Sequence, residues 1–187
     1  MNSDWDLTPD VSRRERLGFD ETIFCASKTP DQINRLLEMA LKAEESLLLT
    51  RLDPEKRLAL SGELGGHLDY DEISHTAILG PVPIPEDTPV VAIVSGGSSD
   101  VRVAREAART LQYYGKGARE IYDVGVAGLW RLLEHVDELR EMDIVITVAG
   151  MEGTLPSVVG GLVPGLVIAV PVATGYGVSA HGITALN

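Results

Sequence analysis

The sequence predicts an α/β protein whose second half forms a three-layer αβα domain around a parallel sheet, and three observations support this. From residue 90 onward, short apolar runs alternate with segments of helical periodicity. The runs at 90–94 and 166–170 are apolar at successive positions, which is typical of strands buried on both faces of a parallel sheet. Helical connections between consecutive strands also require parallel pairing.

Residues 1–79 predict an N-terminal arm followed by a small α/β module. The polar segment 1–29 predicts an extended arm that enters a strand over 22–25. A Thr-Pro pair then begins an amphipathic helix over 29–41, because apolar residues recur at three- and four-residue spacing.

The rest of this module predicts shorter elements. An apolar run at 47–49 predicts a strand, and an Asp-Pro pair begins a second helix over 53–60. The Gly-Gly pair at 65–66 predicts a turn. Residues 67–79 are rich enough in β-branched and aromatic side chains to predict one or two strands.

The proline-rich segment 80–89 predicts a boundary between the two regions. Its four prolines cannot donate backbone hydrogen bonds and keep the chain extended, so we expect a stiff linker. Residues 90–187 then predict the order β-α-β-α-β-α-β. The predicted strands span 90–94, 119–123, 143–149 and 166–172, and the predicted helices span 100–114, 126–140 and 154–163. Doubly wound sheets generally have about five or six strands, so we expect a domain cut short at its C-terminal end, with a natural four-stranded sheet as the alternative.

The composition restricts the partners and the compartment. Sixteen basic against 28 acidic residues give a net charge of −12, which opposes nucleic-acid binding because that requires clustered Lys and Arg. The N-terminus has no signal-peptide pattern, and no apolar stretch reaches the roughly 18 to 20 residues of a membrane helix. We expect a cytoplasmic protein with neither nucleic-acid nor membrane partners.

Glycine-rich loops follow all four predicted strands of the second half. The carboxyl ends of parallel strands meet at one edge of the sheet, where ligands bind, so we expect these loops to line one site. They span 95–100, 123–128, 149–157 and 171–182. The candidate substrate-binding residues in them are Gly96, Gly97, Ser98, Ser99, Gly125, Gly150, Met151, Gly153, Tyr176 and Ser179.

The first of these loops predicts a phosphate site. Gly96 and Gly97 let the backbone approach a ligand closely, and free amides at the following helix start favour an anion. The alternative is that Ser98 or Ser99 only caps the helix, with Asp100 favourably placed in its first turn. The loop is neither a P-loop nor a GxGxxG motif.

Two carboxylates are the candidate catalytic groups. Glu152 directly follows a buried strand, a place suited to general acid or base work, although a helix-start carboxylate is the alternative. Asp100 is the second candidate in the same crevice. For an anion, Arg102 and Arg131 are candidate partners or else surface residues.

Metal ligands and reactive thiols are scarce. The four histidines lie on separate segments without metal-ligand spacing, so the sequence identifies no metal ligands. His181 alone falls in a strand-end loop. The single cysteine, Cys25, follows an apolar strand and is predicted to be a buried thiol.

Four long motifs are distributed from residue 13 to residue 186: RRERLGFDETIFCASKTPDQI, VSGGSSDVRVAREAARTLQYYG, DVGVAGLWRLL and VAGMEGTLPSVVGGLVPGLVIAVPVATGYGVSAHGITAL. They resemble the LarB family, the pyridinium-3,5-biscarboxylic acid mononucleotide synthases of nickel-pincer cofactor biosynthesis. The second half is also similar to the aminoimidazole ribonucleotide (AIR) carboxylases of purine biosynthesis, which share a GSxSD loop and an AG loop before an LP. Their SAHR segment, which contains the catalytic histidine, has no counterpart here.

The LarB resemblance implies a flavodoxin-like domain and a carboxylase-hydrolase. Such an enzyme carboxylates the pyridine ring of nicotinic acid adenine dinucleotide with carbon dioxide or bicarbonate, then hydrolyses the phosphoanhydride and releases AMP. No organic cofactor is implied, and Mg²⁺ is compatible with the hydrolytic half. The family's nucleophilic cysteine would follow ITALN, beyond Asn187, and Cys25 does not match its position.

Two other functions stay open from the sequence. One is an AIR carboxylase or mutase of purine biosynthesis. The other is a nucleotide-binding module without catalysis, because the family's nucleophile is not among these residues. Related domains form symmetric oligomers, so the resemblance also implies a homo-oligomer, with the apolar GGLVPGLVIAV region in an interface.

Overall fold

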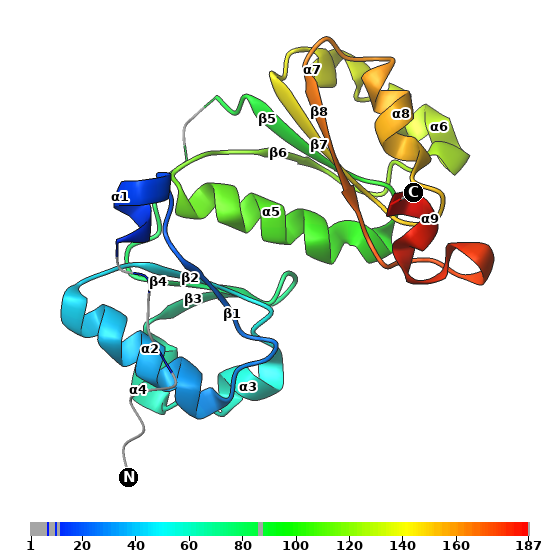
Figure 1. Ribbon diagram of the computed structural model, residues 1–187. Coiled ribbons are helices and arrows are strands. Elements are labelled where there is room, and N and C mark those ends of the chain that lie inside the picture. Colours follow the sequence, from blue (N-terminus) through cyan, green and yellow to red (C-terminus); the bar gives the residue numbers. More distant parts are fainter. Residues whose placement is uncertain (1–6, 8–9, 11, 86–87, 187) are drawn as a thin grey trace. The chain divides into compact units, whose positions relative to one another are not determined.

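The computed structural model describes residues 7, 10, 12–85 and 88–186. The chain divides into two compact units, residues 1–82 and 83–187, each with its own four-stranded sheet (Figure 1). The division falls within the predicted linker at 80–89. In the described part of the chain, no helix is both long enough and apolar enough to cross a bilayer.

The first unit contains a mixed sheet, and two of its helices contribute to the core on one face of that sheet. Its helices are α1 (Arg13–Leu17), α2 (Pro30–Ala43), α3 (Pro54–Leu58) and α4 (Gly62–Gly66), and its strands are β1 (Thr22–Phe24), β2 (Leu47–Thr50), β3 (Leu68–Asp71) and β4 (Thr76–Leu79). The strand order is β1-β2-β4-β3, in which only β1 and β2 pair in parallel. Leu37 of α2 and Leu64 of α4 join Leu49 and Ala77 of the sheet in one core.

Two helices of this unit differ from the sequence-based expectation. The segment 13–17, predicted as part of an extended arm, is helical, and Gly18 ends it in the left-handed conformation. Residues 65–66 belong to α4 rather than to a turn, because Ser61 caps this helix by accepting the Leu64 amide and Leu64 itself is buried. Residues 1–6, 8–9 and 11 of the predicted arm lie outside the described residues.

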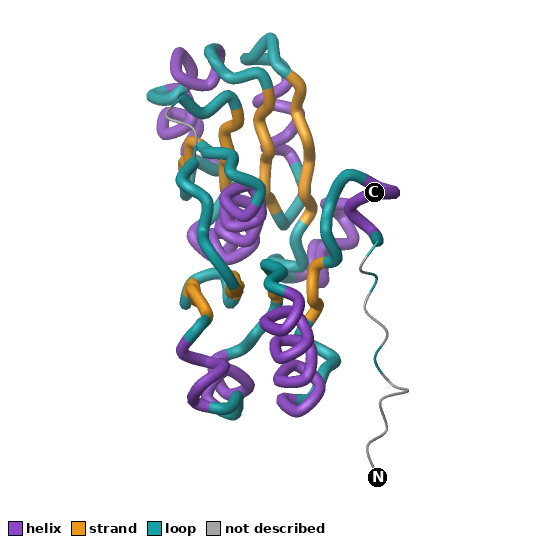
Figure 2. Tube along the Cα trace, turned by 90° about the vertical axis from the view of Figure 1, so that its left-hand side faces the viewer, coloured by secondary structure: helices purple, strands orange, loops and turns teal. Residues whose placement is uncertain are grey.

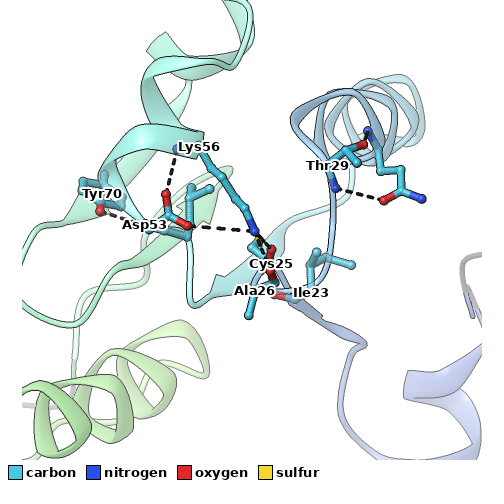
Figure 3. A network of polar contacts seen from close by, with 9 residues as sticks. Ile23, Cys25, Ala26, Thr29, Asp53, Lys56 and Tyr70 are labelled. Atoms are coloured by element: carbon cyan, nitrogen blue, oxygen red, sulfur yellow. Dashed lines mark hydrogen bonds and ion pairs between the residues drawn. The ribbon is translucent and has the colours of Figure 1, made fainter.

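A lysine fastens α3 to the end of β1. The Nζ atom of Lys56 donates to the backbone carbonyls of Cys25, at 2.8 Å, and of Ala26, at 2.6 Å (Figure 3). The backbone amide of Lys56 donates at 2.8 Å to Asp53, which caps α3. These bonds hold the Cys25 backbone in place while its side chain stays completely buried.

The buried thiol gives a first testable expectation. Burial, the dominant effect, raises the pKa of Cys25 to about 12, although Lys56 and Lys28 oppose the shift. Because the thiolate is the reactive form, we expect iodoacetamide at pH 8 to modify Cys25 roughly a hundredfold more slowly in the native protein than in urea. Mass-spectrometric mapping of the peptide that contains Cys25 measures this. Equal rates in the two states would contradict the burial.

The second unit contains a fully parallel sheet. Its strands are β5 (Val91–Ser95), β6 (Arg119–Ile121), β7 (Ile144–Ala149) and β8 (Leu166–Pro171), and its helices are η2 (Ser98–Asp100), α5 (Val101–Tyr113), η3 (Val126–Gly128), α6 (Leu129–Leu133), α7 (Val136–Arg140), α8 (Thr154–Gly160), η4 (Gly177–Gly182) and α9 (Ile183–Leu186). The strand order is β6-β5-β7-β8, the order of the first four strands in a flavodoxin-like sheet.

Helices cover both faces of this sheet, so the predicted three-layer αβα fold is confirmed (Figures 1 and 2). Side chains alternate between the two faces along β5. Ala92 and Val94 pack in a core with residues of α6, α7 and α8, whereas Ile93 packs against Ala104 and Ala108 of α5.

The segment predicted as one helix over 126–140 is instead η3, α6 and α7. Leu132 of α6 and Leu139 of α7 both reach the same core. In a continuous helix, residues seven apart also share a face, so the apolar periodicity does not reveal the break.

Candidate active site

The candidate site lies at the carboxyl edge of the parallel sheet. Strand β5 lies between β6 and β7. The chain first runs from β5 to β6 on one side and then returns past β5 to β7 on the other side, so the direction of the strand order reverses between β5 and β7. The loops that follow these two strands begin at adjacent positions of the sheet. In a doubly wound sheet, the crevice at such a reversal binds ligands.

The loop after β5 is closed by its own aspartate. The Gly97 amide donates to Oδ2 of Asp100 at 2.9 Å, and the Asp100 amide donates back to the Gly97 carbonyl at 3.0 Å. The aspartate is only 5% exposed, and its other carboxylate oxygen, Oδ1, is buried without a hydrogen-bond partner. Such an oxygen carries a desolvation cost that a substrate contact could offset.

Ser98 and Ser99 do not cap the helix. Both residues are exposed, and no side chain caps η2 or α5 by accepting one of their backbone amides. Their hydroxyls and the first amides of the η2–α5 segment are therefore available to an anion at the start of a long helix.

The loop after β6 packs directly against the first loop. A Cβ atom at Gly125 would lie 2.5 Å from the carbonyl oxygen of Gly96, so only glycine allows this approach. Asp123, at the start of the loop, adopts the left-handed conformation with φ of +58°. Its carboxylate pairs with Arg131 at 2.8 Å, which places that arginine beside the loop and not free in solvent.

The loop after β7 makes a tight turn against the segment after β8. The Met151 amide donates to the Thr174 carbonyl at 3.0 Å, and a Cβ at Gly150 would overlap that same carbonyl oxygen. Met151 and Gly153 both have positive φ, of +54° and +66°. Glu152, between them, is exposed, so it lacks the burial expected for a general acid or base.

The segment after β8 contributes one buried and two exposed candidates. Ser179 is 6% exposed, and its amide donates to the Tyr176 carbonyl at 3.1 Å. The Tyr176 side chain is 77% exposed. His181 is exposed as well, with φ of +63°. Tyr176 and His181 are thus accessible to a ligand, whereas Ser179 is buried and hydrogen-bonded within its own segment.

The structure brings most of the predicted residues into one chain of contacts. Gly125 lies against Gly96. A Cβ built at Gly96 would lie 3.4 Å from Asp100 and from Ala149, the last residue of β7. Gly150 comes directly after Ala149 in the chain. Arg102, by contrast, is an exposed residue of α5. Ser95 and Thr174 lie within the predicted loops at 95–100 and 171–182 but were not singled out as site residues, although both bond to a neighbouring loop. Their only signal is a polar residue directly next to a glycine.

Among residues 7, 10, 12–85 and 88–186, no three His, Cys, Asp or Glu side chains come together as a set of metal ligands.

Both halves of the chain match known protein families. Residues 6–81 match the LarB/PurE-like N-terminal domain, and residues 90–186 match AIR carboxylase. An uncharacterised protein of Methanocaldococcus jannaschii is 32% identical over 179 residues, which span 92% of this chain and 70% of that protein. The N5-carboxyaminoimidazole ribonucleotide mutase of the same organism is 35% identical over 86 residues, 44% of this chain and 52% of the mutase.

Proposed function

Since the chain belongs to the LarB-like family, with an AIR carboxylase domain as its second half, we propose that it is a carboxylase-hydrolase acting on nicotinic acid adenine dinucleotide. In this proposal, carbon dioxide or bicarbonate carboxylates the pyridine ring. Water then cleaves the phosphoanhydride, and AMP leaves with the dicarboxylated mononucleotide. The observation that supports it most is the buried, unpartnered Oδ1 of Asp100 in an amide-rich loop.

The first loop would hold the substrate's pyrophosphate. The exposed hydroxyls of Ser98 and Ser99 and the first amides of the η2–α5 segment can donate to phosphate oxygens. Residues 141–187 contain no Lys or Arg, so at the loops after β7 and β8 an anion would depend on backbone amides, hydroxyls or an arginine from elsewhere, such as Arg131. Asp100 would accept a hydrogen bond from a protonated or hydroxyl-bearing group of the substrate through Oδ1, and the loop would have to move slightly on binding, because this oxygen is buried.

The turn after β7 would accommodate the pyridine ring. Glu152 is exposed between two backbone positions with positive φ, so its carboxylate can reach a bound ligand without competing with an intramolecular partner. A carboxylate there can take or return the ring proton that carboxylation displaces. Mg²⁺, if it takes part, would enter with the substrate's phosphates.

The covalent step implied by the LarB resemblance needs a thiolate that Cys25 does not supply. Cys25 is completely buried in the first unit, and its raised pKa of about 12 keeps it protonated near neutral pH.

A change at Glu152 tests its catalytic role. We expect Glu152→Gln to lower the rate of carboxylation about a hundredfold, with substrate binding changed less than about threefold, because glutamine keeps the shape but cannot exchange the proton. Glu141→Gln is the matched control, since Glu141 is an exposed glutamate at the opposite edge of the same sheet. Full activity of Glu152→Gln would contradict the proposed role of Glu152 in proton transfer.

An AIR carboxylase or mutase function is the second candidate, favoured by the 35% identity to the mutase. Against it stands the loop DVGVAG, which lacks the histidine segment of the purine enzymes. Parallel assays of the full-length protein with bicarbonate and either nicotinic acid adenine dinucleotide or AIR separate the two. We expect AMP and a carboxylated mononucleotide from the first substrate only. Carboxylation of AIR alone would replace the proposal, and binding of the dinucleotide without turnover would indicate a non-catalytic module.

We also propose a homo-oligomer, because the related domains form symmetric oligomers. The apolar segment GGLVPGLVIAV would contribute to the interface between subunits.

A further inference from the structure

Ser95 is a buried polar residue that the proposed chemistry does not use. It is the last residue of β5 and is completely buried after the apolar run Val91–Val94. A buried hydroxyl is costly unless it is hydrogen-bonded, so its bonds indicate what it does.

The hydroxyl of Ser95 bonds to two different loops. It donates to the Gly97 carbonyl at 3.3 Å and accepts from the Asp123 amide at 3.0 Å. The backbone carbonyl of Ser95 also accepts from the Val124 amide at 3.0 Å. One residue therefore ties the loop that carries Asp100 to the loop that carries Gly125.

The bond to Asp123 has a particular value. Asp123 adopts a left-handed conformation that a non-glycine residue takes only at some cost in free energy. The hydroxyl of Ser95 and the ion pair with Arg131 are contacts that hold Asp123 there. With the backbone of Asp123 fixed, Gly125 lies against the Gly96 carbonyl. The loop after β6 is thereby held in a defined position relative to the loop after β5.

We propose that Ser95 is a positioning residue, whose hydroxyl holds the loops after β5 and β6 in one preorganised unit for ligand binding. The coupling rests on the hydrogen bonds above. The identity of the ligand rests on the proposed function. Preorganised donors bind an anion more tightly because less conformational freedom is lost on binding.

Hydrogen exchange tests the coupling without turnover. The reporters are the amides of Gly97, bonded to Asp100, and of Gly128, bonded to Gly125, because Ser95 contacts neither amide. In Ser95→Ala we expect both amides to exchange about tenfold faster than in the wild type. Faster exchange at Asp123 alone would overturn the proposal, since it would show only a lost local bond.

Two further variants separate the hydroxyl from packing. Thr147→Val is the matched control, because Thr147 is also completely buried in the sheet and its hydroxyl also donates to a carbonyl, that of Ile168, at 3.3 Å. It should leave both reporter amides unchanged. Ser95→Cys fills a similar space with a weak hydrogen-bonding group and should resemble Ser95→Ala. Wild-type exchange in Ser95→Cys, or fast exchange in Thr147→Val, would overturn the proposal.

Calorimetric titration with nicotinic acid adenine dinucleotide tests the consequence for binding. We expect the Kd to rise about tenfold in Ser95→Ala and to change less than about twofold in Thr147→Val. An unchanged Kd in Ser95→Ala would overturn the positioning role. If the wild type does not bind the dinucleotide at all, the proposed function fails, and hydrogen exchange alone decides on Ser95.

Discussion

Replacing Asp100 by Asn is expected to lower kcat/KM for the carboxylation of nicotinic acid adenine dinucleotide by about a hundredfold. Loss of one charged group in a preorganised site has effects of this size. The asparagine Oδ1 can still accept the Gly97 amide, so the loop keeps its closing bond. What is lost is the charge on a carboxylate that is 5% exposed and has one unpartnered oxygen.

The same substitution should not destabilise the protein. Removing an incompletely hydrogen-bonded buried charge is expected to leave the free energy of unfolding unchanged or raise it by about 1 kcal/mol. Urea-induced unfolding measures this beside the kinetics. Stability that is kept while activity falls is typical of a residue retained for function.

Asp53→Asn is the matched control for Asp100→Asn. Asp53 also accepts a backbone amide at the start of a helix, that of Lys56, but it belongs to the first unit. We expect this variant to keep its kcat/KM within about twofold. If Asp100→Asn were as active as Asp53→Asn, the proposal that the loop after β5 forms part of the active site would be contradicted.

Replacing Gly150 by Ala is expected to have the second large effect. The added Cβ would overlap the Thr174 carbonyl oxygen, and both partners of this contact are backbone. The loop after β7 or the segment after β8 must therefore move. The expected loss is about 2 kcal/mol in the free energy of unfolding, as for overpacked cores, together with most of the activity.

Gly160→Ala provides the comparison within the same unit. Gly160 is the last residue of α8, and no atom beyond its chain neighbours and the backbone of its own helix lies within 4 Å of a Cβ built there. Alanine is favoured over glycine in a helix, so this variant should be as stable as the wild type or more stable by about 0.5 kcal/mol. Equal stability of Gly150→Ala and Gly160→Ala would contradict the close approach to Thr174.

The parallel sheet was predictable because its signal is local. The run Ile144–Ala149 is apolar at every position except Thr147, and such a run between two helices has few alternatives to a central parallel strand. The break between α6 and α7 was not predictable, since Leu132 and Leu139 would share a face with or without it.

The candidate site was predictable at the level of loops and not of side chains. Strand ends in sequence identify which loops meet at the edge of a sheet. They do not reveal that Asp100 turns back to its own loop while Glu152 stays exposed, because this depends on backbone conformations such as the positive φ of Met151. Ser95 escaped notice because a serine that joins two loops resembles any polar residue at a strand end.

Incubation of the full-length protein with nicotinic acid adenine dinucleotide and ¹³C-bicarbonate tests the central claim most directly. The account predicts a mononucleotide that carries one ¹³C carboxylate on its pyridine ring, formed together with AMP in equal amount. Release of AMP with unlabelled nicotinic acid mononucleotide would show a phosphoanhydride hydrolase without carboxylation, and would contradict the account.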